Sequence, residues 1–156
     1  MPMVYTVTPA TPANLTTSAT PATETDAFFV KAGTRNVALQ SVYVIGKGAG
    51  LTAISGIAFR LAKFATASTA GTAITPTPKD PGMQAAKSTA ASRPTAGTTR
   101  TNHVVFGCGA AGPGGWVAPN PDSVIPLEGS AAGSIDMFDV SGTASLSYEF
   151  SAEVVE

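Results

Sequence analysis

The chain has 156 residues, of which 44% are apolar and 12% are charged, and its formal net charge is −1. A chain of this length suits one domain that buries about two-thirds of its unfolded surface. Disordered chains combine low hydrophobicity with high net charge, so this composition excludes a wholly disordered protein. So weak a charge gives little self-repulsion, which is typical of a protein that enters an assembly.

Cysteine and histidine each occur once, as Cys108 and His103, which excludes a disulfide within the chain and a His/Cys metal cluster. The opening residues MPMVYTVTPATP lack the basic and long apolar segments of a signal peptide. No apolar run approaches the roughly 18 residues of a transmembrane helix. We therefore expect synthesis and folding in a cytoplasm, with no membrane segment, no metal and no cofactor.

Charge is distributed unevenly along the chain. Residues 1–100 hold all nine Lys and Arg and only three acids, a net of +6, whereas residues 101–156 hold seven acids and no Lys or Arg. One interpretation is that strands from the two parts neighbour each other within one domain. The other is that complementary patches orient partners or steer association.

The N-terminal part predicts a short strand, MVYTV, followed by an extended arm. The segment TPATPANLTTSATPATETD (Thr8–Asp26) is rich in Pro, Thr and Ala and has no period. We assign residues 1–26 to this strand and arm.

Strand signals recur from Ala27 onward. Ala27–Ala32 and Asn36–Gly46 are rich in Val and aromatic residues. The second segment does not keep one clean face, which predicts a bulge near Gln40–Ser41 or burial on both sides. In Ile54–Phe64, Ile57, Phe59 and Leu61 alternate with Ala58, Arg60 and Ala62, the pattern of a half-buried strand.

Residues 65–102 are again rich in Thr, Ala and Pro, and we expect a long loop insertion there. Only Gly82–Ala91 resembles a short helix. Long loops in compact domains are usually functional or ordered by a partner. Strand patterns resume at HVVFG, and the last segment, TASLSYEFSAEVVE, alternates most clearly, with Tyr148, Phe150 and Val154 on one face.

These elements predict an all-β fold. Seven to nine short strands with hardly any helix favour an antiparallel β-sandwich, jelly-roll-like, with long Pro/Thr/Ala-rich loops. We expect residues 27–156 to form this single domain, with the insertion at about 65–102.

The segment GCGAAGPGGWVAPNPDS (Gly107–Ser123) begins with the G-x-G-x-x-G pattern of dinucleotide-binding turns. That pattern binds a pyrophosphate only where a helix begins at its third glycine. Here Gly112 is followed by Pro113, Gly114 and Gly115, which disfavour a helix. We therefore interpret the segment as a stiff loop. Its Trp116 either plugs one end of the core or is an exposed anchor at an interface.

No other set of residues predicts chemistry. Asp136 and Asp139 are three apart, so in a strand they face opposite sides. His103 and Cys108 are an unconvincing nucleophile–base pair. The basic residues form no run with aromatic stacking partners, which argues against nucleic-acid binding. We predict that the chain is not an enzyme.

With these segments laid out, the chain resembles the decoration, or cement, proteins of tailed-bacteriophage capsids. The resemblance lies in SVYVIGKGAGLTAISGIAFRLAKF, GTAITPTPKDPGMQAAK, GCGAAGPGGWVAPNPDS and GTASLSYEFSAEVVE, which cover most of residues 41–156. It implies a jelly-roll body, dimers or trimers of the chain, and binding to the major capsid protein on the surface of the virion.

On that interpretation the arm and the 65–102 insertion contact partners, with Phe28, Phe29 and Trp116 as candidate aromatic anchors. The alternatives are another virion role, such as a tail-tube, head-completion or fibre-base subunit, and a carbohydrate-binding module. The last would need a row of exposed aromatic side chains.

Overall fold

The structure is a computed structural model, and it describes residues 2–9, 13–15, 25–46, 57–92, 95–108, 112–140 and 146–156. Most of the expected N-terminal arm lies outside these residues. The described part of the chain is mainly strand, with one short 3-10 helix, η2, at Pro121–Ser123. The strands are β1 (Val4–Val7), β2 (Ala13–Leu15), β3 (Thr25–Lys31), β4 (Val37–Gly46), β5 (Ile57–Thr66), β6 (Thr72–Ile74), β7 (Thr77–Pro78), β8 (Thr89–Ser92), β9 (Thr98–Cys108), β10 (Pro113–Val117), β11 (Ile125–Leu127), β12 (Ser134–Asp139) and β13 (Leu146–Val155).

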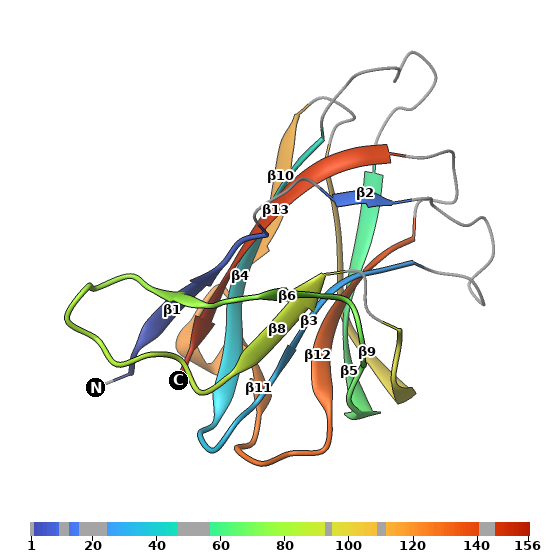
Figure 1. Ribbon diagram of the computed structural model, residues 1–156. Coiled ribbons are helices and arrows are strands. Elements are labelled where there is room, and N and C mark those ends of the chain that lie inside the picture. Colours follow the sequence, from blue (N-terminus) through green and yellow to red (C-terminus); the bar gives the residue numbers. More distant parts are fainter. Residues whose placement is uncertain are drawn as a thin grey trace.

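These strands form one sheet, in the order β6-β8-β3-β12-β5-β9-β10-β4-β13-β1-β7 (Figure 1). β11 also pairs with β4, and β2 with β13. The pairing is antiparallel throughout, for example between β5 and β9 and between β13 and β4. The prediction of an all-β antiparallel fold is therefore confirmed. The sheet is a single curled half-barrel, and the jelly-roll arrangement stays a prediction.

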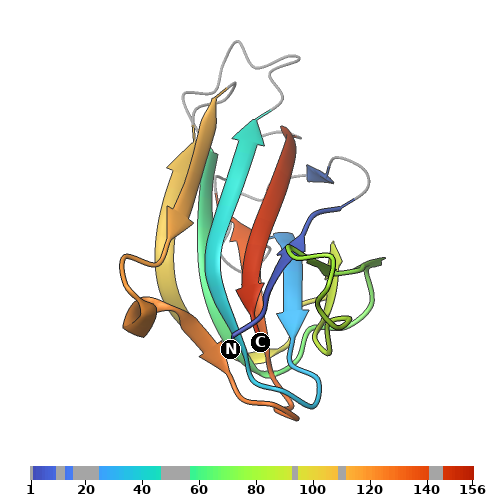
Figure 2. The same ribbon diagram turned by 90° about the vertical axis from the view of Figure 1, so that its left-hand side faces the viewer.

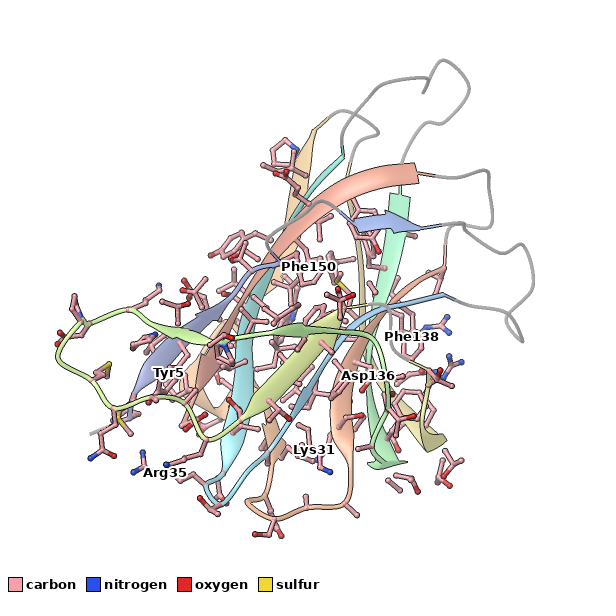
Figure 3. The ribbon with its side chains drawn as sticks, viewed as in Figure 1. Tyr5, Lys31, Arg35, Asp136, Phe138 and Phe150 are labelled. Atoms are coloured by element: carbon pink, nitrogen blue, oxygen red, sulfur yellow. The ribbon has the colours of Figure 1, made fainter. Side chains whose placement is uncertain are left out.

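The curl brings strands that are distant in the sheet order into contact across the core. Phe28 on β3 stacks on Phe150 of β13, with ring centroids 4.7 Å apart. Phe59 on β5 meets Tyr148 of β13 edge to face at 5.0 Å. Figure 2 shows the two halves of the sheet facing each other, and Phe150 lies between them in Figure 3. Each such buried side chain contributes about 2 kcal/mol to folding.

The sequence patterns of the central strands are confirmed. In β4 the register against β13 shifts between Leu39 and Ser41, which is the predicted bulge, and Leu39 and Val42 both face the core. In β13, Tyr148, Phe150, Ala152 and Val154 are buried, whereas Glu149 is exposed. One face of the last strand is therefore in the core and the other is outside.

The structure corrects the interpretation of residues 65–102 as a loop. This part of the chain contains β6, β7 and β8 as well as the start of β9. β6 pairs with β8 at one end of the sheet, and β7 pairs with β1 at the other. Residues 72–78 therefore connect the two ends of the curled sheet. The helix expected over Gly82–Ala91 is wrong: the segment is a turn that leads into β8.

Asp136 on β12 is fully buried, and so is its neighbour Ser134. Since Ile135 and Met137 face the core, Asp136 and Ser134 point to the outer side of the sheet. The Ser134 hydroxyl donates to Asp136 Oδ1 at 2.5 Å, and the Ser68 hydroxyl donates to Asp136 Oδ2. The backbone N–H of Ser68 donates to Ser134 Oγ at 3.0 Å. We call these three residues the serine–aspartate cluster.

The cluster holds two chain connections against the outer side of the sheet. One leads from β5 to β6 and contains Ser68; the other leads from β8 to β9 and contains Gly97, whose N–H donates to Ser68 Oγ at 2.9 Å. Thr69 and Thr95 join the two connections by an antiparallel bridge. A Cβ at Gly97 would collide with the backbone carbonyl of Thr66, so only glycine allows this approach.

We expect Ser134→Ala to lower the free energy of unfolding by about 2 kcal/mol, because it removes two buried hydrogen bonds, one to Asp136 and one from the N–H of Ser68. Ser41→Ala is the matched control. Ser41 is also buried, but its hydroxyl has no hydrogen-bond partner in the described structure. Its removal should leave stability unchanged or raise it by up to about 1 kcal/mol. Urea denaturation of the two variants measures the difference, and equal losses would contradict this role of the cluster.

Candidate interaction surface

The glycine segment does not begin a helix. β9 ends at Cys108, and the residues that follow Gly112 form β10, which pairs with β4. A Cβ at Gly114 would collide with the backbone of Gly107 and Cys108, so glycine is needed where the two strands meet. No helix therefore begins at Gly112, as expected. The interpretation of the whole segment as a stiff loop is corrected, because Pro113–Val117 is a strand and Pro121–Ser123 a short 3-10 helix.

The chemical candidates from the sequence are not brought together. His103 and Cys108 lie on the same strand, five residues or about 16 Å apart. Cys108 is buried, whereas His103 is exposed. Asp136 is fully buried, and both of its carboxylate oxygens accept hydrogen bonds within the serine–aspartate cluster. Among the described residues no three His, Cys, Asp or Glu side chains gather where they could hold a metal ion.

The three candidate anchors have different positions. Phe28 is fully buried in the core, and Phe29 is 8% exposed. Within this chain both rings are therefore covered, which leaves little of their surface for contact with a partner. Trp116 is half-buried and packs against the core from β10. This position agrees with the interpretation of Trp116 as a plug at one side of the core.

Exposed apolar side chains instead gather on β4 and β10. Tyr43 and Ile45 are 49% and 52% exposed, and Val117 is 51% exposed. Tyr43 is opposite Gly115 and Ile45 opposite Pro113, so a small or rigid residue on β10 flanks each large residue on β4. We call Tyr43, Ile45 and Val117 the apolar patch. β4 and β10 contain no charged residue at all.

Two grooves border the patch along β1, β4 and β13. The first groove has a volume of about 330 Å³, and the second of about 560 Å³. The first is lined by Thr8, Pro9, Tyr43, Ile45, Glu149, Phe150 and Ser151. The second is lined by Pro2, Val4, Ala38, Gln40, Ala118, Pro119, Asn120, Pro121, Val124 and Val155. The first groove contains Pro9 and the second Pro2, Pro119 and Pro121, residues whose backbone φ angle is fixed.

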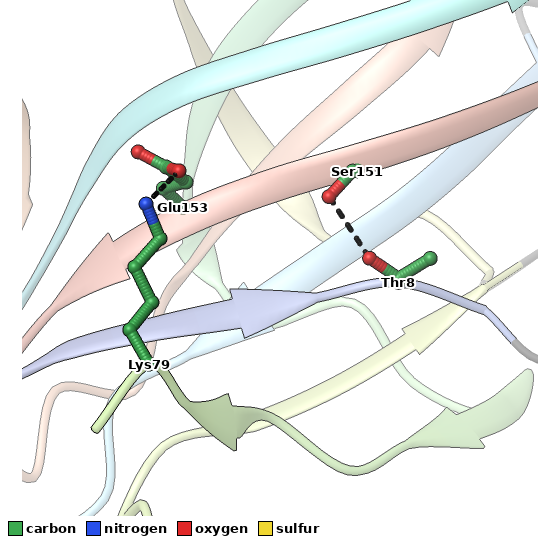
Figure 4. Close-up of polar contacts among 4 residues, drawn as sticks. All are labelled: Thr8, Lys79, Ser151 and Glu153. Atoms are coloured by element: carbon green, nitrogen blue, oxygen red, sulfur yellow. Dashed lines mark hydrogen bonds and ion pairs between the residues drawn. The ribbon is translucent and has the colours of Figure 1, made fainter. Parts of the chain in front are cut away.

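Two polar contacts lie along the outer side of β13, one of them at the wall of the first groove (Figure 4). The Lys79 ammonium pairs with the Glu153 carboxylate, and the hydroxyls of Thr8 and Ser151 are 2.9 Å apart. The ion pair joins a base from the first part of the sequence to an acid from the last part. In this instance the uneven charge is neutralised within one molecule, as the first interpretation of the charge asymmetry requires.

Sequence reasoning did not identify the apolar patch. The signal was present: once Val42 and Val44 face the core, Tyr43 and Ile45 must point outward, although both are large and apolar. The bulge at Gln40 hid this alternation, because it shifts the period in the middle of the strand.

Comparison of the chain with protein-family models, with curated proteins and with solved structures found no match. The described residues contain no helix that is both long and apolar enough for a membrane crossing.

The protonation of His103 gives a test of the local electrostatics at β9. Partial burial and then the positive charge of Lys63 lower the pKa of His103 below its usual value of 6.5. Lys63→Gln should raise this pKa towards 6.5, and NMR titration of the imidazole measures the change. Because the unfolded chain takes the proton more readily, stability should fall as the pH drops below about 6.5. His103→Gln should remove that part of the pH dependence, and an unchanged slope would contradict the assignment.

Proposed function

We propose that this chain is a non-enzymatic structural protein of a tailed-phage virion that binds the outer surface of the head. In this role it cements adjacent subunits of the major capsid protein. The observation that carries the proposal is the apolar patch with its two grooves, on the outer side of a rigid sheet. Such a surface suits contact with a folded protein, since large exposed apolar side chains are enriched in the centres of interfaces.

The fold suits a load-bearing part of an assembly. The curled sheet, which we propose to be a jelly-roll-like body, presents the patch on strands whose inner sides are anchored in the core by Val42 and Val44. The backbone of the patch is therefore already ordered before binding, which removes that part of the entropic cost of association. Many copies on one head add their contacts, so each interface can be modest.

The sequence resemblance supplies the identity of the partner in this proposal. The expected partner-binding segments are the N-terminal arm and the 65–102 region. Within the latter, β6, β7 and β8 belong to the sheet, and the turn between β7 and β8 extends from the body (Figure 1). We propose that this turn, rather than the whole region, reaches towards a neighbouring capsid subunit.

Co-sedimentation with heads assembled without the chain tests the proposal. The double variant Tyr43→Ser with Ile45→Thr should weaken binding by roughly ten-fold or more, because about 1.4 kcal/mol of apolar contact corresponds to that factor. The control is Ala73→Ser with Ala132→Ser, which changes two exposed apolar residues elsewhere. Equal affinity of the two double variants, or no sedimentation of the unaltered protein, would contradict the proposal.

A further inference from the structure

Strand β9 has one open edge. On one side it pairs with β5 over almost its whole length, from Thr98 to Cys108. On the other side it pairs with β10 at a single position, Cys108 opposite Gly114. From Cys108 back towards Thr98 the two strands diverge. Figure 1 shows the Thr98 end of β9, at the bottom of the view, well apart from β10 and β11. From Thr101 to Phe106 no described strand pairs with this edge, whereas the backbone of Gly107 already lies against Gly114.

The chemistry of such an edge specifies what it can bind. A strand edge presents a row of backbone N–H and C=O groups at a fixed spacing, and an extended chain satisfies them. Added strands are a recurrent way in which β-proteins bind partners. The ligand class for this edge is therefore an extended polypeptide.

The side chains around Val105 indicate which polypeptide fits. Val105 is 62% exposed, the largest value among the exposed large hydrophobic residues of the described chain. Its neighbours Val104 and Phe106 point to the other side, where they pack half-buried against the core. The triplet Val104–Phe106 is thus apolar on both sides of the strand, although it lies at an open edge.

We propose that β9 pairs antiparallel with β9 of a second copy, with the two-fold axis at Val105. This register places Val105 opposite Val105 of the second copy on the outer side. On the inner side it places Val104 opposite Phe106. Cross-strand apolar pairs of this kind are the unit of sheet stability, and a two-fold contact requires such a self-complementary surface.

Charge supports the same register. In a two-fold contact, the residue on the axis lies opposite the same residue of the second molecule, so a charged residue there would be repelled. Arg100 and His103 lie five and two residues from the centre, so neither faces itself, and His103 is opposite Gly107. β9 contains no acid that would favour a differently charged partner strand. The register of β9 against β5 shifts at His103, which marks a β-bulge. This bulge limits the proposed pairing with the second copy to the residues that follow His103.

This pairing concerns β9 and not the apolar patch of β4 and β10, so it does not depend on the proposed function and is tested without phage heads. The first experiment is disulfide trapping of Val105→Cys in a Cys108→Ala background. Residues that face each other across an antiparallel pair have Cα atoms about 4.5–5.5 Å apart, within the range that a disulfide spans. Under mild oxidation we expect a covalent dimer.

The matched control is Thr101→Cys in the same background. Thr101 is exposed on the same strand, but the proposed register places it opposite residue 109 rather than opposite itself. Its cross-linking should be at least ten-fold slower than that of Val105→Cys. Equal rates at the two positions, or no dimer with Val105→Cys, would overturn the proposal.

A second measurement keeps the proposal testable if the cysteine variants fold poorly. In sedimentation equilibrium the unaltered protein should be dimeric, and Val105→Lys, which places two ammonium groups opposite each other, should weaken the dimer at least ten-fold. Thr72→Lys, on exposed β6, should leave the dimer intact. A monomeric unaltered protein, or a Val105→Lys dimer of unchanged strength, would refute the β9 pairing.

Discussion

A single sheet with one apolar face can remove that face from water only by curling upon itself. The contact that closes this curl is the stacking of Phe28 on Phe150, supported by Phe59 against Tyr148. It holds β3 against β13 across the core, and the side chains of the strands between them alternate between this core and the outer side. The outward positions, including those of Tyr43 and Ile45, follow from the same alternation.

The curl does not close on both sides. On one side residues 72–78 link β8 to β1, so both ends of the sheet are covered by one short stretch of chain. On the other side β9 and β10 touch at Gly114 and then separate. The half-barrel is therefore closed on the side where residues 72–78 connect β8 with β1, and it is open on the side where β9 and β10 separate. The same geometry leaves Trp116 and Phe106 half-buried rather than fully enclosed.

The long-range character of the contacts explains what the sequence could predict. The alternation of β13 and the bulge in β4 could be recognised, because both are local patterns of large residues. β6, β7 and β8 were missed because TAI, TP and TAAS are short and rich in Ala and Thr, and they become strands only through pairing with distant segments. The buried Asp136 is hydrogen-bonded by Ser68, which is 68 residues away, so no local sequence pattern could predict its burial. Consecutive residues of a strand point to opposite sides, yet Phe28 and Phe29 are both buried, because segments distant in the sequence cover both sides of β3.

The two ends of the described chain lie side by side (Figures 1 and 2). Met3 and Glu156 exchange a pair of backbone hydrogen bonds of 2.9 Å each, at one end of the antiparallel pair of β1 and β13. A force applied through these two residues would unzip that pair from its end, breaking its bonds in succession. A force spread over the broad sides of the sheet would load many bonds at once. We therefore expect the molecule to resist a force applied through the broad sides of the sheet better than one applied through Met3 and Glu156.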